Sequence, residues 1–257
     1  MTFIDEIKNA VRSAQTAIVA GAEKNVIKKG DFNYATEVDI AVQELLREKL
    51  LRLEAAQFLG EESETDIDWT RPAWVVDPID GTTNLMHGYN HSAVCAAFWD
   101  GVQIRCGVIF DPYRDEIYWA QRGGGAYLND ASIHVSDTPD ITHSLIAIET
   151  APYNKELADE TFGLYKKVFE RCRDVRCSGS AALDFAHLAS GRVDASLSRV
   201  LCPWDWAAGA VLVEEAGGII CGWDGAPLNL KNAQSDTYGG NSRLKKALFG
   251  LIRPNCQ

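Results

Sequence analysis

The chain has 257 residues, 46% hydrophobic and 24% charged, so it is long enough for a substantial core and has an ordinary globular composition. Its 36 acidic and 25 basic residues give a formal net charge of −11. We therefore expect no nucleic acid and no membrane partner, because polyanionic surfaces require a basic protein face.

The cysteines and the N-terminus point to a reduced intracellular environment. The seven cysteines form an odd set, and none of them has the C-x-x-C spacing of a zinc or redox motif. Residues 1–8 lack the basic and apolar regions of a secretory signal. No apolar run approaches the length that spans a bilayer. These features predict a soluble, cytoplasmic protein.

Two amphipathic helices are predicted at the start of the chain. Apolar residues recur at three- and four-residue steps over residues 4–18. The same pattern over residues 38–53 has charged residues on the opposite face. Between them, the Lys-Lys-Gly-Asp segment at 28–31 is predicted to form a turn that leads to Thr36 and Asp39 at the start of the second helix.

The middle of the chain favours an antiparallel sheet packed against these helices. The predicted strands, several separated by short turns, are 73–77, 92–99, 102–110 and 115–120.

From about residue 140, strands and helices alternate instead. The predicted strands are 144–149, 174–177, 193–197 and 218–221, and the predicted helices are 156–171, 180–190 and 205–216. This change predicts an N-terminal α+β lobe at 1–139 and a C-terminal α/β lobe at 140–257. No flexible linker separates them, so the lobes should share an interface.

The most informative segment is residues 74–84, Trp-Val-Val-Asp-Pro-Ile-Asp-Gly-Thr-Thr-Asn. An apolar run ends at Asp77, and Pro78, which has no amide hydrogen, is predicted to end the strand. Asp80 and a turn-forming glycine follow, and Thr82 is a residue type that starts helices. Two carboxylates thus lie beside a helix N-terminus suited to an anion, which indicates metal-assisted phosphate chemistry.

Two further acidic residues stand out. Glu61 follows a strand-like apolar run, and Asp205 lies between two tryptophans at the start of an apolar helix, where an unpaired charge is costly to bury. Each acidic signal has an ordinary interpretation: a solvated glutamate pair, a helix N-cap, or an Asx-type turn in the 74–84 segment. Their occurrence together, in this order, favours one shared site.

Three sequence blocks resemble the signature motifs of the inositol monophosphatase family. They are Gly60-Glu61-Glu62, Asp-Pro-Ile-Asp-Gly-Thr-Thr-Asn at 77–84, and Trp-Asp-Trp-Ala-Ala-Gly at 204–209. The resemblance spans nearly the whole chain. This family belongs to the metal-dependent, lithium-sensitive phosphatases, with fructose-1,6-bisphosphatase and bisphosphate nucleotidase. The resemblance implies a layered αβαβα sandwich of the α+β class, Mg²⁺-dependent phosphomonoesterase activity and a homodimer.

The resemblance also implies a set of site residues. Two or three Mg²⁺ ions would be held by Glu61, Asp77, the carbonyl of Ile79, Asp80 and Asp205. The residues that would activate an attacking water are Asp39, Thr82 and Glu61. Phosphate would bind to the amides of Gly81, Thr82 and Thr83, and the rest of the substrate to Gly179, Ser180 and Ala181. Lys28 would support the site from the Glu61 side, although a single lysine here could equally be solvated.

Substrate identity stays open at this level. Inositol-specific relatives usually have an acidic residue at the position of Ser198, and a serine supplies no charged acceptor. Arg199 could pair with a second phosphate or could neutralise a neighbouring carboxylate. We expect a small, inositol monophosphate-like metabolite, with fructose 1,6-bisphosphate, a 3′,5′-bisphosphonucleotide and histidinol phosphate as alternatives.

The alternative outside the enzymes is a catalytically silent regulatory or scaffold homologue. Such a protein would be expected to have lost a metal ligand or the pair formed by Asp39 and Thr82. All of these residues are present in the chain.

Overall fold

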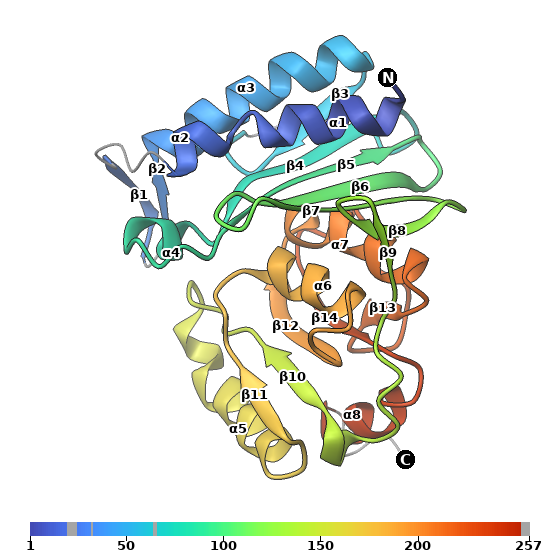
Figure 1. Ribbon diagram of the computed structural model, residues 1–257. Helices are drawn as coiled ribbons and strands as arrows, with labels where there is room; N and C mark the ends of the chain where they lie inside the picture. The colour runs from blue at the N-terminus through green and yellow to red at the C-terminus, as the bar shows by residue number, and fades with distance from the viewer. Residues whose placement is uncertain (20–24, 32, 64–65, 253–257) are drawn as a thin grey trace.

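The computed structural model describes residues 1–19, 25–31, 33–63 and 66–252, and its elements form five layers in the order α, β, α, β, α (Figure 1). The first layer contains α1 (Phe3–Arg12), α2 (Gln15–Val19) and α3 (Glu37–Leu53). The central layer contains α6 (Ala181–Ala189) and α7 (Pro203–Glu215), and the last contains α5 (Ala158–Phe169) and α8 (Lys245–Ile252). The predicted αβαβα sandwich is confirmed.

A seven-stranded sheet lies between the first and central helical layers. In spatial order its strands are β3 (Gln57–Gly60), β4 (Ala73–Asp80), β5 (Ala93–Trp99), β6 (Ile104–Asp111), β7 (Glu116–Gln121), β8 (Gly125–Leu128) and β9 (Ala131–Ile133). All neighbours are antiparallel except β3 and β4, which are parallel. The four strands predicted here are therefore present in the expected sheet.

The second sheet has five strands and separates the central helices from α5 and α8. Its spatial order is β11 (Asp174–Arg176), β10 (Leu145–Ile148), β12 (Ala195–Leu201), β14 (Ser235–Gly240) and β13 (Ile219–Gly222). The strand β14 was not predicted. Its sequence, Ser-Asp-Thr-Tyr-Gly-Gly, contains serine, aspartate and glycine, which are rare in strands, and it has few apolar residues. The segment between β9 and β10 contains the proposed lobe boundary.

Three local expectations are corrected by the structure. The segment predicted as a turn at 28–31 belongs mainly to β1 (Val26–Gly30), which pairs antiparallel with β2 (Asn33–Thr36). The single opening helix is divided at Ser13, whose hydroxyl donates to the carbonyl of Ala10 at 2.6 Å. Pro78 does not end its strand, because the register between β4 and β5 shifts between Asp77 and Asp80 and a bulge needs no amide donor there.

Buried apolar side chains fill each space between layers. α1 and α3 pack on one face of the large sheet through residues such as Ile7, Leu46 and Trp74. α6 and α7 join its other face to the C-terminal half in one continuous cluster. Along the described part of the chain, the helices are too short or too polar to traverse a lipid bilayer.

The central helix α7 approaches β6 closely at Gly107. A Cβ added to Gly107 would lie 2.7 Å from the carbonyl oxygen of Ala208, which is backbone and cannot rotate away. We expect Gly107→Ala to reduce the free energy of unfolding by about 1–3 kcal/mol, measured by urea denaturation.

The matched control is Gly163→Ala in α5, where the added Cβ meets no atom within 4 Å. This change should leave stability equal or raise it by up to about 1 kcal/mol, because alanine favours a helix over glycine. Equal effects of the two substitutions would show that the contact between β6 and α7 is not tight.

Candidate active site

The predicted acidic residues meet in one cavity of about 490 Å³ where the two halves of the chain face each other. The end of β4 supplies Asp77 and Asp80, the segment after β3 supplies Glu61, and the start of α7 supplies Asp205. These residues are far apart in sequence, and they meet because the ends of β3 and β4 and the start of α7 all border the cavity.

The bulge of β4 fixes the first two carboxylates. The carboxylate of Asp77 accepts a hydrogen bond from the amide of Ile79 at 2.9 Å. Gly81 follows with a φ of +89°, and a Cβ there would lie 3.0 Å from the carbonyl oxygen of Gly179. Only glycine combines this φ with this close approach, so Gly81 is required where the chain turns into the short helix α4 (Thr82–Met86).

Asp80 connects the two halves of the protein. Its Oδ2 accepts hydrogen bonds from the hydroxyl of Ser180 and from the amide of Ala182, the latter at 2.9 Å. Ser180 is the N-cap of α6 and is fully buried. This corrects the expectation for Ser180, which lies beneath the cavity instead of facing a substrate, whereas Gly179 and Ala181 line the cavity.

Asp205 occupies the third position of α7. Its Oδ2 accepts a hydrogen bond from the amide of Cys202 at 2.7 Å, so one carboxylate oxygen caps the helix. The N-cap interpretation is therefore wrong: Cys202 is the N-cap, and Asp205 completes a capping box from the first turn while it also lines the cavity.

Asp39 reaches the cavity through Thr82. Its Oδ1 accepts a hydrogen bond from the Thr82 hydroxyl at 2.9 Å, and its Oδ2 accepts from the amide of Thr36 at 2.8 Å and from the Thr36 hydroxyl. Asp39 is completely buried, while Thr82 lines the cavity. The pair expected from the sequence is therefore in contact.

The carboxylates perturb one another strongly. Burial, followed by the charge of nearby acidic groups, holds the pKa of Asp77 and of Asp205 well above the usual range. Burial also raises the pKa of Glu61, with Lys29 opposing the shift. Burial raises the pKa of Asp80 to about 7 against the lowering effect of the Ser180 hydroxyl. Negative charge in this cavity thus needs a compensating cation.

The donor set fits Mg²⁺, which prefers carboxylate and carbonyl oxygens. Asp77, Asp80 and Asp205 each use only one carboxylate oxygen in the hydrogen bonds above, and the carbonyl of Ile79 accepts from Thr82 at 3.1 Å. No three acidic, histidine or cysteine side chains in the described ranges are grouped closely enough to hold an ion without adjustment.

Lys29, not Lys28, reaches the acidic cavity. The ammonium of Lys29 lies 3.0 Å from Glu61 and 2.6 Å from Glu62, whereas Lys28 pairs with Asp31 at 2.9 Å. The expectation for Lys28 is corrected because 28–31 begins in a strand, where successive side chains point to opposite faces.

This correction gives a direct prediction. For the phosphate release that the family resemblance implies, Lys29→Ala should lower kcat/KM by about 10- to 100-fold, since it removes the partner that positions Glu61. Lys28→Ala should have less than about a twofold effect, because Lys28 is exposed and its partner is local. Steady-state kinetics of the two variants decide the point, and a larger loss in the Lys28 variant would contradict the assignment.

Ser198 and Arg199 do not line the cavity. Ser198 is buried. The guanidinium of Arg199 bonds Glu160 at 2.8 Å, lies 3.7 Å from Asp236 and stacks over Trp223. This corrects their expected role in substrate binding, and the alternative interpretation of Arg199, neutralisation of neighbouring carboxylates, agrees with the structure.

Other cavity residues were not identified from the sequence. Glu149 accepts hydrogen bonds from the amides of Ser178 and Gly179 at 2.9 and 3.0 Å and so holds the loop before α6. Its only sequence signal was its place at the end of a predicted strand. Tyr153 and Trp204 add aromatic rings to the lining.

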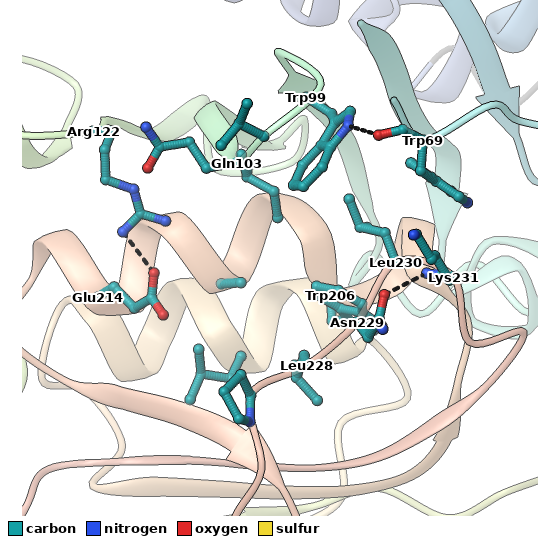
Figure 2. A pocket seen from close by; sticks show the side chains of 15 residues that line it. Trp69, Trp99, Gln103, Arg122, Trp206, Glu214, Leu228, Asn229, Leu230 and Lys231 are labelled. Carbon is teal, nitrogen blue, oxygen red and sulfur yellow. Dashed lines mark hydrogen bonds and ion pairs between the residues drawn. The ribbon is translucent and has the colours of Figure 1, made fainter. Parts of the chain in front are cut away.

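A second cavity, of about 280 Å³, lies between the turn joining β5 to β6, α7 and the segment before β14 (Figure 2). Three tryptophans surround it, and the indole nitrogen of Trp99 donates to the carbonyl of Trp69 at 3.1 Å. Arg122 and Glu214 form an ion pair at its edge. None of the four clustered carboxylates lines this cavity, so the acidic cavity is the candidate active site.

Comparison with known proteins adds independent findings. The model of the inositol monophosphatase family matches residues 2–254. The chain is 36% identical over 252 residues to a Xylella fastidiosa protein named Nus factor SuhB, covering 95% of this chain and 91% of that protein. It is 36% identical over 228 residues to a Rhizobium meliloti inositol-1-monophosphatase, covering 88% and 85%. Among solved structures, a Thermotoga maritima IMPase has a TM-score of 0.90 at 26% identity, covering 99% and 98%.

Proposed function

We propose that this chain, which belongs to the inositol monophosphatase family, is a Mg²⁺-dependent phosphomonoesterase that hydrolyses a small phosphorylated metabolite by direct attack of water. The observation that supports this most is the convergence of Glu61, Asp77, Asp80 and Asp205 in one cavity beside the bonded pair of Asp39 and Thr82. A catalytically silent homologue would be expected to have lost a metal ligand or the pair of Asp39 and Thr82.

The acidic residues and the carbonyl of Ile79 would hold two or three Mg²⁺ ions. Bound Mg²⁺ would neutralise the phosphate and lower the pKa of a water molecule. Lys29 holds Glu61 in place, and the hydrogen bonds to Asp77, Asp80 and Asp205 fix one oxygen of each carboxylate so that the other faces the cavity.

Asp39 and Thr82 would orient the attacking water and remove its proton. The Thr82 hydroxyl directs its single hydrogen towards both Asp39 and the carbonyl of Ile79, so its oxygen lone pairs can accept a hydrogen bond from water in the cavity. The buried Asp39 thereby influences the water without contacting solvent. Glu61 would assist, because it lines the same cavity.

The phosphate would bind at the turn into α4. The amides of Gly81, Thr82 and Thr83 belong to the cap and first turn of this helix, where backbone amides have no partner within the helix. Gly179 and Ala181 would contact the remainder of the ester, because both line the cavity on the opposite half.

The test is a phosphate-release panel with inositol monophosphates, fructose 1,6-bisphosphate, a 3′,5′-bisphosphonucleotide and histidinol phosphate. We expect release in the presence of Mg²⁺ and none after removal of the metal by a chelator. Hydrolysis in ¹⁸O-labelled water should place the label in phosphate, and its appearance in the alcohol would exclude direct attack on phosphorus. A homodimer and a cytoplasmic location complete the proposal, and light scattering tests the first.

A second candidate comes from the relative named Nus factor SuhB, to which 95% of this chain aligns. For this candidate, the expected absence of nucleic acid contact would need a direct binding assay. Failure to release phosphate from every ester in the panel with Mg²⁺ present would favour this candidate over the phosphatase.

A further inference from the structure

Val200 has an unusual backbone conformation. Among the described residues, four that are not glycine have a positive φ: Asn90, Asp115, Asn129 and Val200. Asparagine and aspartate tolerate this region, but a β-branched side chain strongly disfavours it. With a φ of +60°, Val200 is the one strained residue of the four, and it lies in the wall of the acidic cavity.

The surroundings hold Val200 in this conformation. The pairing of β12 with β14 shifts register between Ser198 and Leu201, so Val200 lies in a bulge. Its amide donates to Asp236 at 2.9 Å, and the other oxygen of Asp236 lies 3.7 Å from Arg199. Backbone strain that is fixed by such contacts occurs mostly at functional sites.

Val200 adds apolar surface to the cavity that contains the carboxylates. Val200 and Leu201 line the cavity together with Trp204 and Tyr153, whose side chain is 53% exposed. Polar groups, including the amide of Gln234, are also present in the lining. The cavity therefore contains both acidic groups, suited to metal and phosphate, and apolar side chains that the alcohol could contact.

We propose that Val200 is a specificity residue that contacts the alcohol part of the substrate and selects phosphate esters whose alcohol presents an apolar or aromatic face. This inference rests on the proposed phosphatase function and narrows its substrate class. Hydroxyl groups pressed against an apolar wall lose hydrogen bonds to water without replacement, so a fully hydroxylated ring binds less well there. The position of Ser198 and Arg199 outside the cavity lining agrees with this assignment.

The experiment compares two esters of the same ring size, cyclohexyl phosphate and inositol 1-phosphate, which differ in their ring hydroxyls. The value of kcat/KM for cyclohexyl phosphate is divided by the value for inositol 1-phosphate, and this ratio is measured with Mg²⁺ for the wild type, Val200→Thr and Val200→Gly. Dividing each variant's ratio by the wild-type ratio cancels the intrinsic reactivity of the esters. We expect Val200→Gly to lower the ratio about tenfold or more and Val200→Thr to lower it in the same direction.

The two variants separate contact from strain. Threonine keeps the shape and the β-branched strain of valine while exchanging a methyl group for a hydroxyl, whereas glycine removes both strain and contact. Val102→Thr is the matched control, because Val102 is 80% exposed and lies outside the acidic cavity, and it should leave the ratio unchanged.

Different failures have different meanings. An unchanged ratio in both Val200 variants, with all proteins folded by circular dichroism, overturns the role of Val200 while the phosphatase function stands. Equal losses for both esters overturn it as well, since they reveal a general structural effect. If the wild type releases phosphate from neither these esters nor the wider panel, the proposed function itself fails and the inference fails with it.

Discussion

Thr82→Val should lower kcat for phosphate release by about 10²- to 10⁴-fold, the range typical of lost acid–base assistance. Valine has the shape of threonine but cannot donate to Asp39 or accept a hydrogen bond from water. The link between the buried carboxylate and the cavity, a single hydrogen bond of 2.9 Å, is therefore removed. KM should change little, because Thr82 would contribute its amide, which valine retains, to phosphate binding.

The same substitution should reduce the free energy of unfolding by about 1–3 kcal/mol, since Asp39 loses a partner while buried. Thr82→Ser is the control, because it restores the hydroxyl and should recover most of kcat and stability. Urea denaturation and steady-state kinetics on the three proteins separate the two effects. A valine variant with wild-type kcat would exclude Thr82 from the reaction.

Asp80→Asn should lower kcat/KM by about 10²- to 10³-fold and yet stabilise the protein when no metal is present. Asparagine keeps an oxygen that can accept from Ser180 and Ala182, so the cap on α6 survives. It lacks the negative charge, which contributes repulsion to the acidic cluster and attraction to Mg²⁺. Activity should therefore favour aspartate at position 80, whereas stability without metal should favour asparagine.

The stabilising effect should depend on pH. The pKa of Asp80 is raised to about 7 in the folded protein, mainly by burial, whereas an aspartate in an unfolded chain has a pKa of about 3.9. Between these values the folded state binds more protons, so the contribution of Asp80 to stability falls as the pH rises from about 4 to about 7. The melting temperature of the metal-free variant should exceed that of the wild type at pH 7 and match it near pH 4.

Asp130→Asn provides the matched control, because Asp130 is exposed in the turn between β8 and β9. It should leave kcat/KM unchanged. Adding Mg²⁺ at pH 7 should raise the melting temperature of the wild type more than that of the Asp80 variant. A ligand that binds the folded state stabilises that state, and the variant should bind Mg²⁺ more weakly. Equal rises in melting temperature in the two proteins would show that Asp80 does not bind Mg²⁺.

The acidic residues could be predicted because each leaves a local signal. Asp77 and Asp80 follow an apolar strand, and Asp205 interrupts an apolar segment between tryptophans. A carboxylate at such a position is expected to be buried and therefore to need a partner. The family resemblance then predicted that these carboxylates share one site. The comparisons confirm the family and the layered fold.

Other features depend on backbone geometry that single residues do not reveal. The choice between Lys28 and Lys29 requires knowing that the segment is a strand, because a turn would present both side chains differently. Ser180 looks equally suited to a substrate or a helix cap, and only the position of Asp80 decides. The strain at Val200 comes from a bulge between β12 and β14, and β14 itself has little sequence signal.

The cap that Asp80 provides for α6 has a consequence for how the protein can be divided. Residues 1–139 contain Glu61, Asp77 and Asp80, while the helix that Asp80 caps and Asp205 belong to residues 140–257. Cutting the connection between β9 and β10 would leave each fragment with only part of the proposed set of metal ligands. Phosphate release would then report the reassembly of the two fragments, which makes this connection the natural cut for a split-enzyme sensor.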